Sequence, residues 1–245
     1  MKKILFMLIM CLSFVACSKD NGEEVTPMVT LSFNQQIVSS NSMTRATTNE
    51  FLDIISEQTP DYVNVTLKNL DLNKTYTCKS NETITIPIGN YEISAKSSSG
   101  TYTQLSSGGN DIMYHTPTLC CDLFSTTIKQ STSQVTLNVY YNCYAIFAFI
   151  DECKSCNEDN YNSHSLIKKG KYYVGYFKKE RTKITLTPYD NSTEFITTTY
   201  NFSTTYDVNK VFAEFGKYYV IHPQKVDKTS CSFNVNITDM DEGEI

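Results

Sequence analysis

The sequence contains no tryptophan, two arginines and three histidines among its 245 residues. Its lysines and arginines form no cluster, and acidic residues outnumber basic residues by 26 to 21. Such a chain lacks the Lys and Arg stripes that nucleic-acid phosphates require, so we predict no nucleic-acid partner. The low glycine count, nine, and the abundance of Thr, Tyr, Phe, Val and Ile favour strands over helices.

The motifs of common enzyme classes are also missing. His115, His164 and His222 are neither paired at metal-ligand spacing nor placed beside a run of carboxylates, so each is predicted to be an ordinary surface or strand residue. No G-x-S-x-G, H-E-x-x-H, P-loop or G-x-G-x-x-G motif is present. The sequence therefore predicts no catalytic residue, no metal site and no cofactor.

An apolar run near the N-terminus ends abruptly at a cysteine. Two lysines precede the run at residues 4–16, which is shorter than the roughly 20 apolar residues of a transmembrane helix. The step from Ala16 to Cys17 resembles a bacterial lipobox, although Phe14 stands where leucine is usual. We predict a lipoprotein signal peptide at 1–16, lipidation of Cys17 and anchoring in the outer membrane at the cell surface. The alternative is that Cys17 is simply the end of a cleaved signal peptide.

Seven more cysteines follow, and this odd number leaves at least one unpaired unless the protein forms an intermolecular link. The strongest local signal is "CKSC", Cys153 to Cys156. A redox motif would stand at a helix N-terminus, but the polar residues that follow are typical of a loop. A zinc site would need a second C-x-x-C pair, which the adjacent Cys120 and Cys121 do not supply. A disulfide between Cys153 and Cys156 within a loop, or two unrelated thiols, needs no further partner, and that loop disulfide is our candidate bond.

Several stretches show the period-two alternation of half-buried strands. They are "YVNVTLKNL" (62–70), "TITIPIGNYEISA" (83–95), "QVTLNVYYNC" (134–143) and "CSFNVNI" (231–237). "AIFAFI" (145–150) is apolar on both faces, so we predict that it is a central strand.

Two stretches have apolar residues at helical spacing, "EFLDIISE" (50–57) and "DVNKVFAEFG" (207–216), where Gly216 would end the helix. Many short strands separated by turns are typical of β-sandwiches. We predict an all-β fold of two consecutive antiparallel β-sandwich domains, at 46–140 and 141–245, with one or two short helices. Residues 17–45 would form a lipidated stalk and a removable first strand.

Several features together resemble the fimbrillin-like surface lipoproteins of the Bacteroidetes. The lipoprotein signal is followed by "SKDNGEE" (18–24), which is similar to their surface-export tag, and "MTRATTNEF" (43–51) has a Thr-Arg-Ala step in a polar linker. "ITIPIGNYEISA" (84–95) is similar to a stretch of their transthyretin-like first sandwich, and "VTLNVYYNCYAIFAFI" (135–150) resembles the strand that leads into the second. The resemblance covers nearly the whole chain and implies a transthyretin-like first domain, although this chain is shorter than typical stalk subunits.

The resemblance also implies an assembly mechanism. In that family an Arg-specific protease cuts the linker, and the matching cut here falls between Arg45 and Ala46 and removes the strand at 28–38. Loss of this strand would leave unpaired N–H and C=O groups for a strand of the next subunit. The alternative is that Arg45 stays uncut in a lipoprotein that never polymerises. The segment 232–237 is either the donor strand or the last strand of its own sheet.

Three functions follow from these observations. The first is a non-enzymatic, lipid-anchored surface protein, a fimbrial or fimbrillin-like subunit that assembles with other subunits or itself and binds a host or glycan ligand. The second is a glycan-binding accessory lipoprotein of a polysaccharide-uptake system, which the absence of tryptophan weakens, although 17 tyrosines could supply aromatic surface. The third is a thiol oxidoreductase based on "CKSC". We predict the first.

Overall fold

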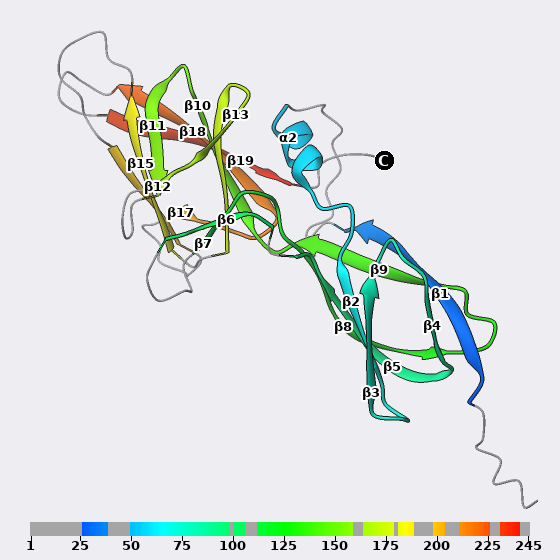
Figure 1. Ribbon diagram of the computed structural model, residues 1–245. Coiled ribbons are helices and arrows are strands. Elements are labelled where there is room, and N and C mark those ends of the chain that lie inside the picture. The colour runs from blue at the N-terminus through cyan, green and yellow to red at the C-terminus, as the bar shows by residue number, and fades with distance from the viewer. Residues whose placement is uncertain are drawn as a thin grey trace, which may run out of the picture.

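The computed structural model consists almost entirely of strands (Figure 1). The residues that it describes are 26–38, 50–98, 100–105, 112–158, 164–178, 181–188, 198–203, 211–225 and 231–240. The predicted signal peptide, Cys17, Arg45 and Ala46 lie outside these residues. None of the helical structure within the described ranges is long and apolar enough to cross a membrane.

The strands form three sheets, and the all-β prediction is confirmed. The first part of the chain forms β1 (Met28–Ile37), the helix α2 (Glu50–Gln58), β2 (Asn64–Asn69), β3 (Lys74–Lys79), β4 (Ile84–Pro87), β5 (Gly89–Lys96), β6 (Tyr102–Gln104), β7 (Ile112–Tyr114), β8 (Leu119–Ile128) and β9 (Gln134–Tyr141). The second part forms β10 (Tyr144–Phe149), β11 (Cys153–Glu158), β12 (His164–Ser165), β13 (Ile167–Lys169), β14 (Tyr172–Phe177), β15 (Arg181–Pro188), β16 (Thr198–Ser203), β17 (Val211–Phe212), β18 (Lys217–Lys225) and β19 (Cys231–Asp239).

The first sheet has the strand order β3-β2-β5-β8-β9-β1-β4. Its alternating sequences place one side-chain row inside, as in β2, where Val65 and Leu67 are buried and Thr66 and Lys68 are exposed. Strand β1 runs antiparallel to β4 and parallel to β9. The N-terminal strand therefore joins β4, at one end of this sheet, to β9.

The second sheet has the order β19-β18-β10-β14-β7-β6, and the third has the order β12-β11-β15-β16-β17. Apolar side chains between these two sheets form a buried cluster that includes Ile146, Tyr219 and Leu186. The β6–β7 hairpin precedes β8 in sequence, yet β7 pairs with β14 of the second sheet. The division of the chain at residues 140 and 141 stays a prediction.

Strand β10 is the centre of the second sheet, as its apolar sequence predicted. It pairs with β14 on one side and with β18 on the other, and residues 144–148 are fully buried. Ala145 and Phe147 belong to the apolar cluster shared with the first sheet, whereas Tyr144 and Ile146 face the third sheet. Both faces of β10 are covered, so its sequence needs no polar alternation.

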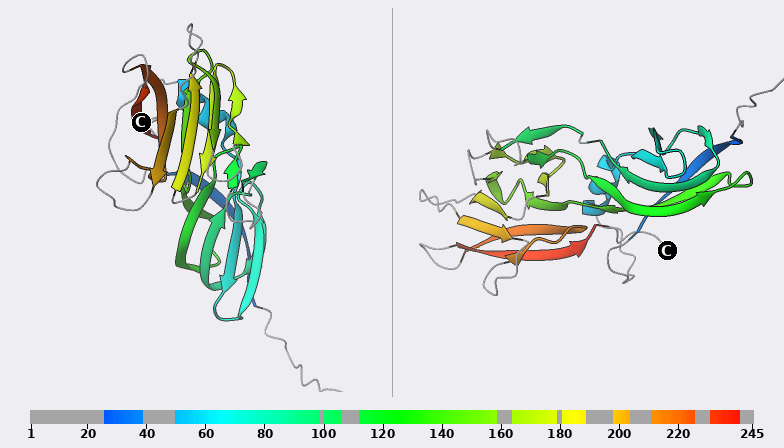
Figure 2. Two further views of the ribbon diagram at one scale, coloured as in Figure 1. Left: turned by 90° about the vertical axis from the view of Figure 1, so that its left-hand side faces the viewer. Right: turned by 90° about the horizontal axis from the view of Figure 1, so that it is seen from below.

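Helix α2 covers the face of the second sheet that contains Phe147 (Figures 1 and 2). The ring of Phe51 lies 4.8–6.0 Å, between centroids, from the rings of Phe147, Phe149, Tyr172 and Tyr218. At the C-terminal end the hydroxyl of Thr59 donates to the carbonyl of Ile55, 2.7 Å away. The helix predicted at 50–57 is therefore present, and aromatic packing fixes it on the sheet.

The second predicted helix, at 207–216, is wrong where the structure describes it. Val211 and Phe212 form β17, which pairs in parallel with β16. The chain then turns at Gly216, whose φ of 76° suits glycine, and the N–H of Gly216 donates to the carbonyl of Cys143 at 2.9 Å. Valine and phenylalanine fit a strand as well as a helix. The pairing of β17 with β16 and the bond from Gly216 to Cys143 replace the hydrogen bonds that a helix would make. Residues 207–210 lie outside the described part of the chain.

Replacement of Phe51 by alanine should destabilise the protein because it removes the ring that fixes α2 on the second sheet. We expect Phe51→Ala to lower the free energy of unfolding by about 2–4 kcal/mol. The measurement is urea unfolding followed by circular dichroism. Leu123 is 64% exposed, so the control Leu123→Ala should change the same quantity by less than about 0.5 kcal/mol. Equal effects of the two variants would contradict this account of α2.

Candidate functional site

The main candidate site is the slot that β1 fills in the first sheet. Residues 28–31 pair with β4 and residues 32–37 pair with β9, so one strand joins two others that do not pair with each other among the described strands. Further backbone bonds extend the pairing beyond the strand ends, from the N–H of Val38 to the carbonyl of Val139 and from the N–H of Ile88 to the carbonyl of Pro27.

Only a few side chains of β1 are buried. Leu31 is fully buried, Val29 is 9% exposed, and Phe33 packs against the same core from a partly buried position. Next along the inward row, Gln35 accepts a hydrogen bond from the hydroxyl of Ser80 at 2.9 Å. Strand β1 is therefore bound mainly through its backbone, with a short apolar row as its anchor.

The walls of this slot are apolar. The strands on either side of β1, β4 and β9, contribute inward side chains that are at most 8% exposed, namely Ile86, Val135, Leu137 and Val139. Within the described chain β4 pairs with β1 alone. An empty slot would therefore expose a hydrophobic groove with one row of free backbone groups on each side, which is the arrangement that accepts an added strand.

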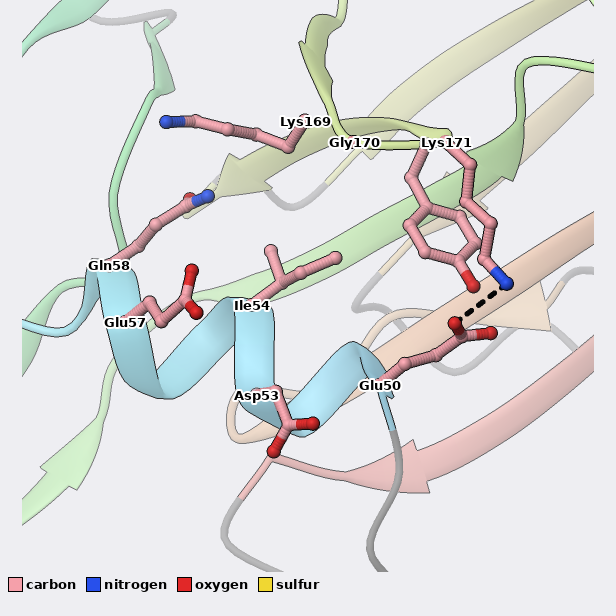
Figure 3. Close-up of a pocket in the computed structure, with 9 residues that line it drawn as sticks. Glu50, Asp53, Ile54, Glu57, Gln58, Lys169, Gly170 and Lys171 are labelled. Carbon is pink, nitrogen blue, oxygen red and sulfur yellow. Dashed lines mark ion pairs between the residues drawn. The ribbon is translucent and has the colours of Figure 1, made fainter.

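A second candidate is the pocket between α2 and the turn that joins β13 to β14 (Figure 3). Its volume is about 410 Å³, and its lining includes Glu50, Asp53 and Glu57 of the helix and Lys169 and Lys171 at the turn. Glu50 and Lys171 point toward each other, whereas Asp53 points away from the turn (Figure 3). Lys171 Nζ lies 2.7 Å from Glu50 Oε2, and both side chains are about half exposed. The hydrogen bond from Lys171 lowers the pKa of Glu50, and the same bond raises the pKa of Lys171. Burial raises the pKa of Tyr172 to about 12.

The chemistry available in this pocket is limited. Its closest charged groups neutralise each other in a partly exposed ion pair instead of converging on one point. The residues that the structure describes contain no group of three His, Cys, Asp or Glu side chains that could hold a metal ion. The pocket can accept a small polar molecule, but its geometry does not assemble a nucleophile with a base.

The "CKSC" cysteines lie on a strand and not in a loop. The pairing of β11 with β15 shifts register between Cys153 and Ser155, and this irregularity turns both Cys153 and Cys156 into the cluster between the second and third sheets. Cys153 Sγ lies 3.0 Å from the carbonyl oxygen of Phe149, to which it donates. Burial raises the pKa of Cys153 to about 12 and that of Cys156 well above its ordinary value.

These positions bear on the three interpretations of "CKSC". A redox motif lowers a thiol pKa at a helix N-terminus, whereas here a strand and burial raise it. Cys121 lies in the cluster of the first sheet and Cys156 in the other cluster, so they do not form one zinc site. Both thiols of β11 are free in the structure, and a Cys153–Cys156 disulfide stays a prediction.

The three histidines lie in separate parts of the fold. His115 Nε2 is 2.8 Å from the hydroxyl of Thr103, and His164 lies in β12. His222 of β18 pairs with Glu152, its Nδ1 3.0 Å from Oε2, and its ring stacks on Phe149. Sequence reasoning missed this pair and the Glu50–Lys171 pair because their partners are 70 and 121 positions apart.

A further groove, of about 440 Å³, lies over β8 and β9. The pairing of β5 with β8 shifts register between Ile93 and Ala95, and within this irregular stretch Leu123 is 64% exposed. The hydroxyl of Tyr140 donates to Asp122 beside it. Among the described residues, β8 and β9 pair at only two positions, Leu119↔Tyr141 and Cys120↔Tyr140, so the two strands separate along the groove.

Comparison with known proteins gives likeness at the level of structure only. No family model matches the chain, and no curated protein matches it. One similar structure, provisionally named a cell adhesion protein, comes from Bacteroides uniformis; it has 11% identity and a TM-score of 0.45, with 88% of this chain and 99% of that one covered. A fimbrial assembly protein from Parabacteroides distasonis has 10% identity and a TM-score of 0.45, with 89% and 97% covered. A provisionally named polysaccharide-binding protein from Bacteroides thetaiotaomicron has 10% identity and a TM-score of 0.40, with 86% and 97% covered. Similarity at this level does not assign a function.

The buried thiols of β11 should be inert in the folded protein. We expect iodoacetamide at pH 8 to leave Cys153 and Cys156 unlabelled in the native state, because both side chains are inaccessible and protonated. The measurement is peptide mass spectrometry. The control is protein that is unfolded without reductant. Alkylation of both cysteines in this sample shows that they are thiols, and the absence of alkylation shows that they form the disulfide. Native-state labelling of Cys156 at the rate of an exposed cysteine would contradict the buried strand.

The ion pair of α2 should make a pH-dependent contribution to stability. The pKa of Glu50 is lowered in the folded state, so its stabilisation is present above the unfolded-state pKa, about 4.3, and is lost as the pH falls through the folded-state value. We expect Glu50→Gln to lower the melting temperature at pH 7 and to lose that effect on acidification toward pH 2, as followed by circular dichroism. The control Glu57→Gln alters the same pocket at a side chain that has no ion pair within the described structure. A Glu50→Gln effect that is unchanged from pH 7 to pH 2 would contradict the assignment.

Proposed function

We propose that this protein is a lipid-anchored, cell-surface structural or adhesion subunit of fimbrial type that assembles by strand exchange and has no catalytic role. The observation that supports this most directly is the position of β1 between β4 and β9. The strand is followed by the segment 39–49, which contains Arg45, one of two arginines in the chain. A cut after Arg45 would separate β1 from the rest of the protein without breaking any other strand that the structure describes.

The exchange would place a strand of a second copy in the slot. The incoming strand would have to run parallel to β9 and antiparallel to β4, with apolar side chains at the positions of Leu31 and Phe33. Backbone hydrogen bonds would supply most of the affinity, and these few side-chain positions would set the register.

The last strand, β19, is the donor that we propose. Its segment "CSFNVNI" (231–237) is identical to "LSFNQQI" (31–37) of β1 at four of seven positions. In the same alignment Val235 takes the position of Gln35, which makes the inward row of the donor more apolar. Strand β19 pairs with β18 over its whole length at the edge of the second sheet, and its Ile237 is 52% exposed. Donation therefore requires β19 to leave its own sheet, and an edge strand can do so without opening the sheet interior.

The first test is proteolytic assembly with an Arg-specific protease. We expect the wild-type protein to yield a new N-terminus at Ala46 and then ladders of oligomers on unboiled gels. Arg45→Lys keeps the positive charge but removes the cleavage site, so this variant should stay monomeric. N-terminal sequencing and gel electrophoresis measure the two steps separately.

The slot itself is tested by adding back the lost strand. A synthetic peptide of residues 28–38 should occupy the groove of the cut protein and suppress the ladders. The same peptide with Leu31→Asp should fail, because the Leu31 side chain is fully buried and a carboxylate there would be desolvated. Ladders from uncut Arg45→Lys protein, or ladders that neither peptide affects, would refute strand exchange through this slot.

A further inference from the structure

Exposed apolar side chains gather at the end of the first sheet where β1 begins. Met28 is 47% exposed, Leu70 44% and Leu72 41%. The N–H of Leu70 donates to the carbonyl of Asn90 at 2.8 Å, and the N–H of Ile88 donates to the carbonyl of Pro27 at 2.9 Å. The β2–β3 turn and the start of β1 thus both bind the residues around the start of β5, and the views of the molecule place them at one end (Figures 1 and 2).

We propose that this end of the sheet, with Leu70 and Leu72 of the β2–β3 turn as its contact residues, rests on the lipid surface that holds the N-terminal anchor. The inference depends on the lipid anchor of the proposed function and adds to it a specific face of the folded domain. Leucines on a short turn can enter the boundary between headgroups and acyl chains without any change of fold.

The turn holds its leucines in a fixed arrangement. The N–H of Leu72 donates to Oδ1 of the buried Asn69 at 2.8 Å, and Asn73 has a left-handed φ of 49°. Between the leucines, the carboxylate of Asp71 accepts hydrogen bonds from the backbone N–H of Asn90 at 2.8 Å and from its side-chain amide at 3.1 Å. The charge of Asp71 is therefore directed toward β5, and the leucines are left as the apolar part of the turn.

The length of the N-terminal segment favours lipid as the occupant. Nine residue steps separate Cys17 from Thr26, the first described residue. Fully extended they span at most about 30 Å, and as a flexible chain about 17 Å. With acyl chains on Cys17, this end of the sheet cannot leave the neighbourhood of the bilayer. A contact that is weak in free solution becomes populated at the high effective concentration that such a tether gives.

Basic residues near the turn fit an anionic lipid surface. Lys74 directly follows the turn, and Lys129 is next to Gln130, whose side-chain amide lies 3.4 Å from the carbonyl of Met28. Both lysines are exposed. Lysines beside an inserted apolar turn lie at the level of the headgroups, where they attract anionic lipid.

The absence of tryptophan from the chain allows a direct test. The lipidated full-length variants Leu72→Trp and Leu70→Trp are incorporated in vesicles of phosphatidylcholine and phosphatidylglycerol, with and without brominated acyl chains. We expect blue-shifted emission and quenching by the brominated lipid for both variants. The matched control is Leu123→Trp, a leucine that is 64% exposed on β8, and its emission should stay that of a water-exposed indole.

The outcomes separate this inference from the proposed function. Suppose that the protein floats with the vesicles, but the tryptophans of L72W and L70W show water-exposed emission that brominated lipid does not quench. This result would overturn the lipid contact and leave the anchor intact. A blue shift that needs no vesicles and grows with protein concentration would assign the turn to contact between protein copies and would also overturn it. Protein that does not float and lacks acyl chains by mass would refute the anchor and this inference together.

Discussion

The first sheet depends on the backbone pairing of β1 with two strands that, within the described residues, do not pair with each other. Four residues of β1 pair with β4 and six with β9, in opposite orientations. Without this strand the sheet would end at β9, and β4 would lose its partner within the described chain. Because most of the bonds are made by main-chain groups, which all residues except proline provide alike, the slot constrains a strand's direction and length more than its sequence.

The two parts of the molecule share packing and backbone bonds where β9 leads into β10. One apolar cluster contains Leu137 of the first sheet together with Phe147 and Tyr218 of the second. At the junction the N–H of Thr118 donates to Sγ of Cys143, and the N–H of Gly216 donates to the Cys143 carbonyl. Such a continuous core, crossed by hydrogen bonds, transmits a load from one sheet to the other better than a flexible linker would, and this would suit the proposed anchoring at one end.

The sequence predicted those parts of the fold that depend on local pattern. Strict alternation identified β2 and β9, and the doubly apolar run identified β10 as central, because burial on one or both faces leaves a direct trace in the sequence. The same reasoning failed at residues 211–216, where apolar residues at helical spacing form a short strand with β16. It also placed "CKSC" in a loop, because a strand irregularity that turns Cys153 and Cys156 to one side has no signature in residue spacing. The parallel pairing of β1 with β9 joins residues about 100 positions apart, and local sequence contains no information about it.

The location of the anchor and of β1 on the same peptide has a consequence for the proposed assembly. While the chain is intact, β1 is joined to α2 by the eleven residues 39–49, so it refills its slot faster than any strand of another molecule can enter. A cut after Arg45 would end this advantage and make β1 a separate peptide that competes with donor strands on equal terms. The same cut would place Cys17 and Met28 on the departing peptide, so the domain would lose the proposed lipid tether and part of the apolar end beside Leu72. In the proposed assembly, release from the lipid surface and opening of the slot would then be one event, and a subunit that is still anchored would have its acceptor groove filled.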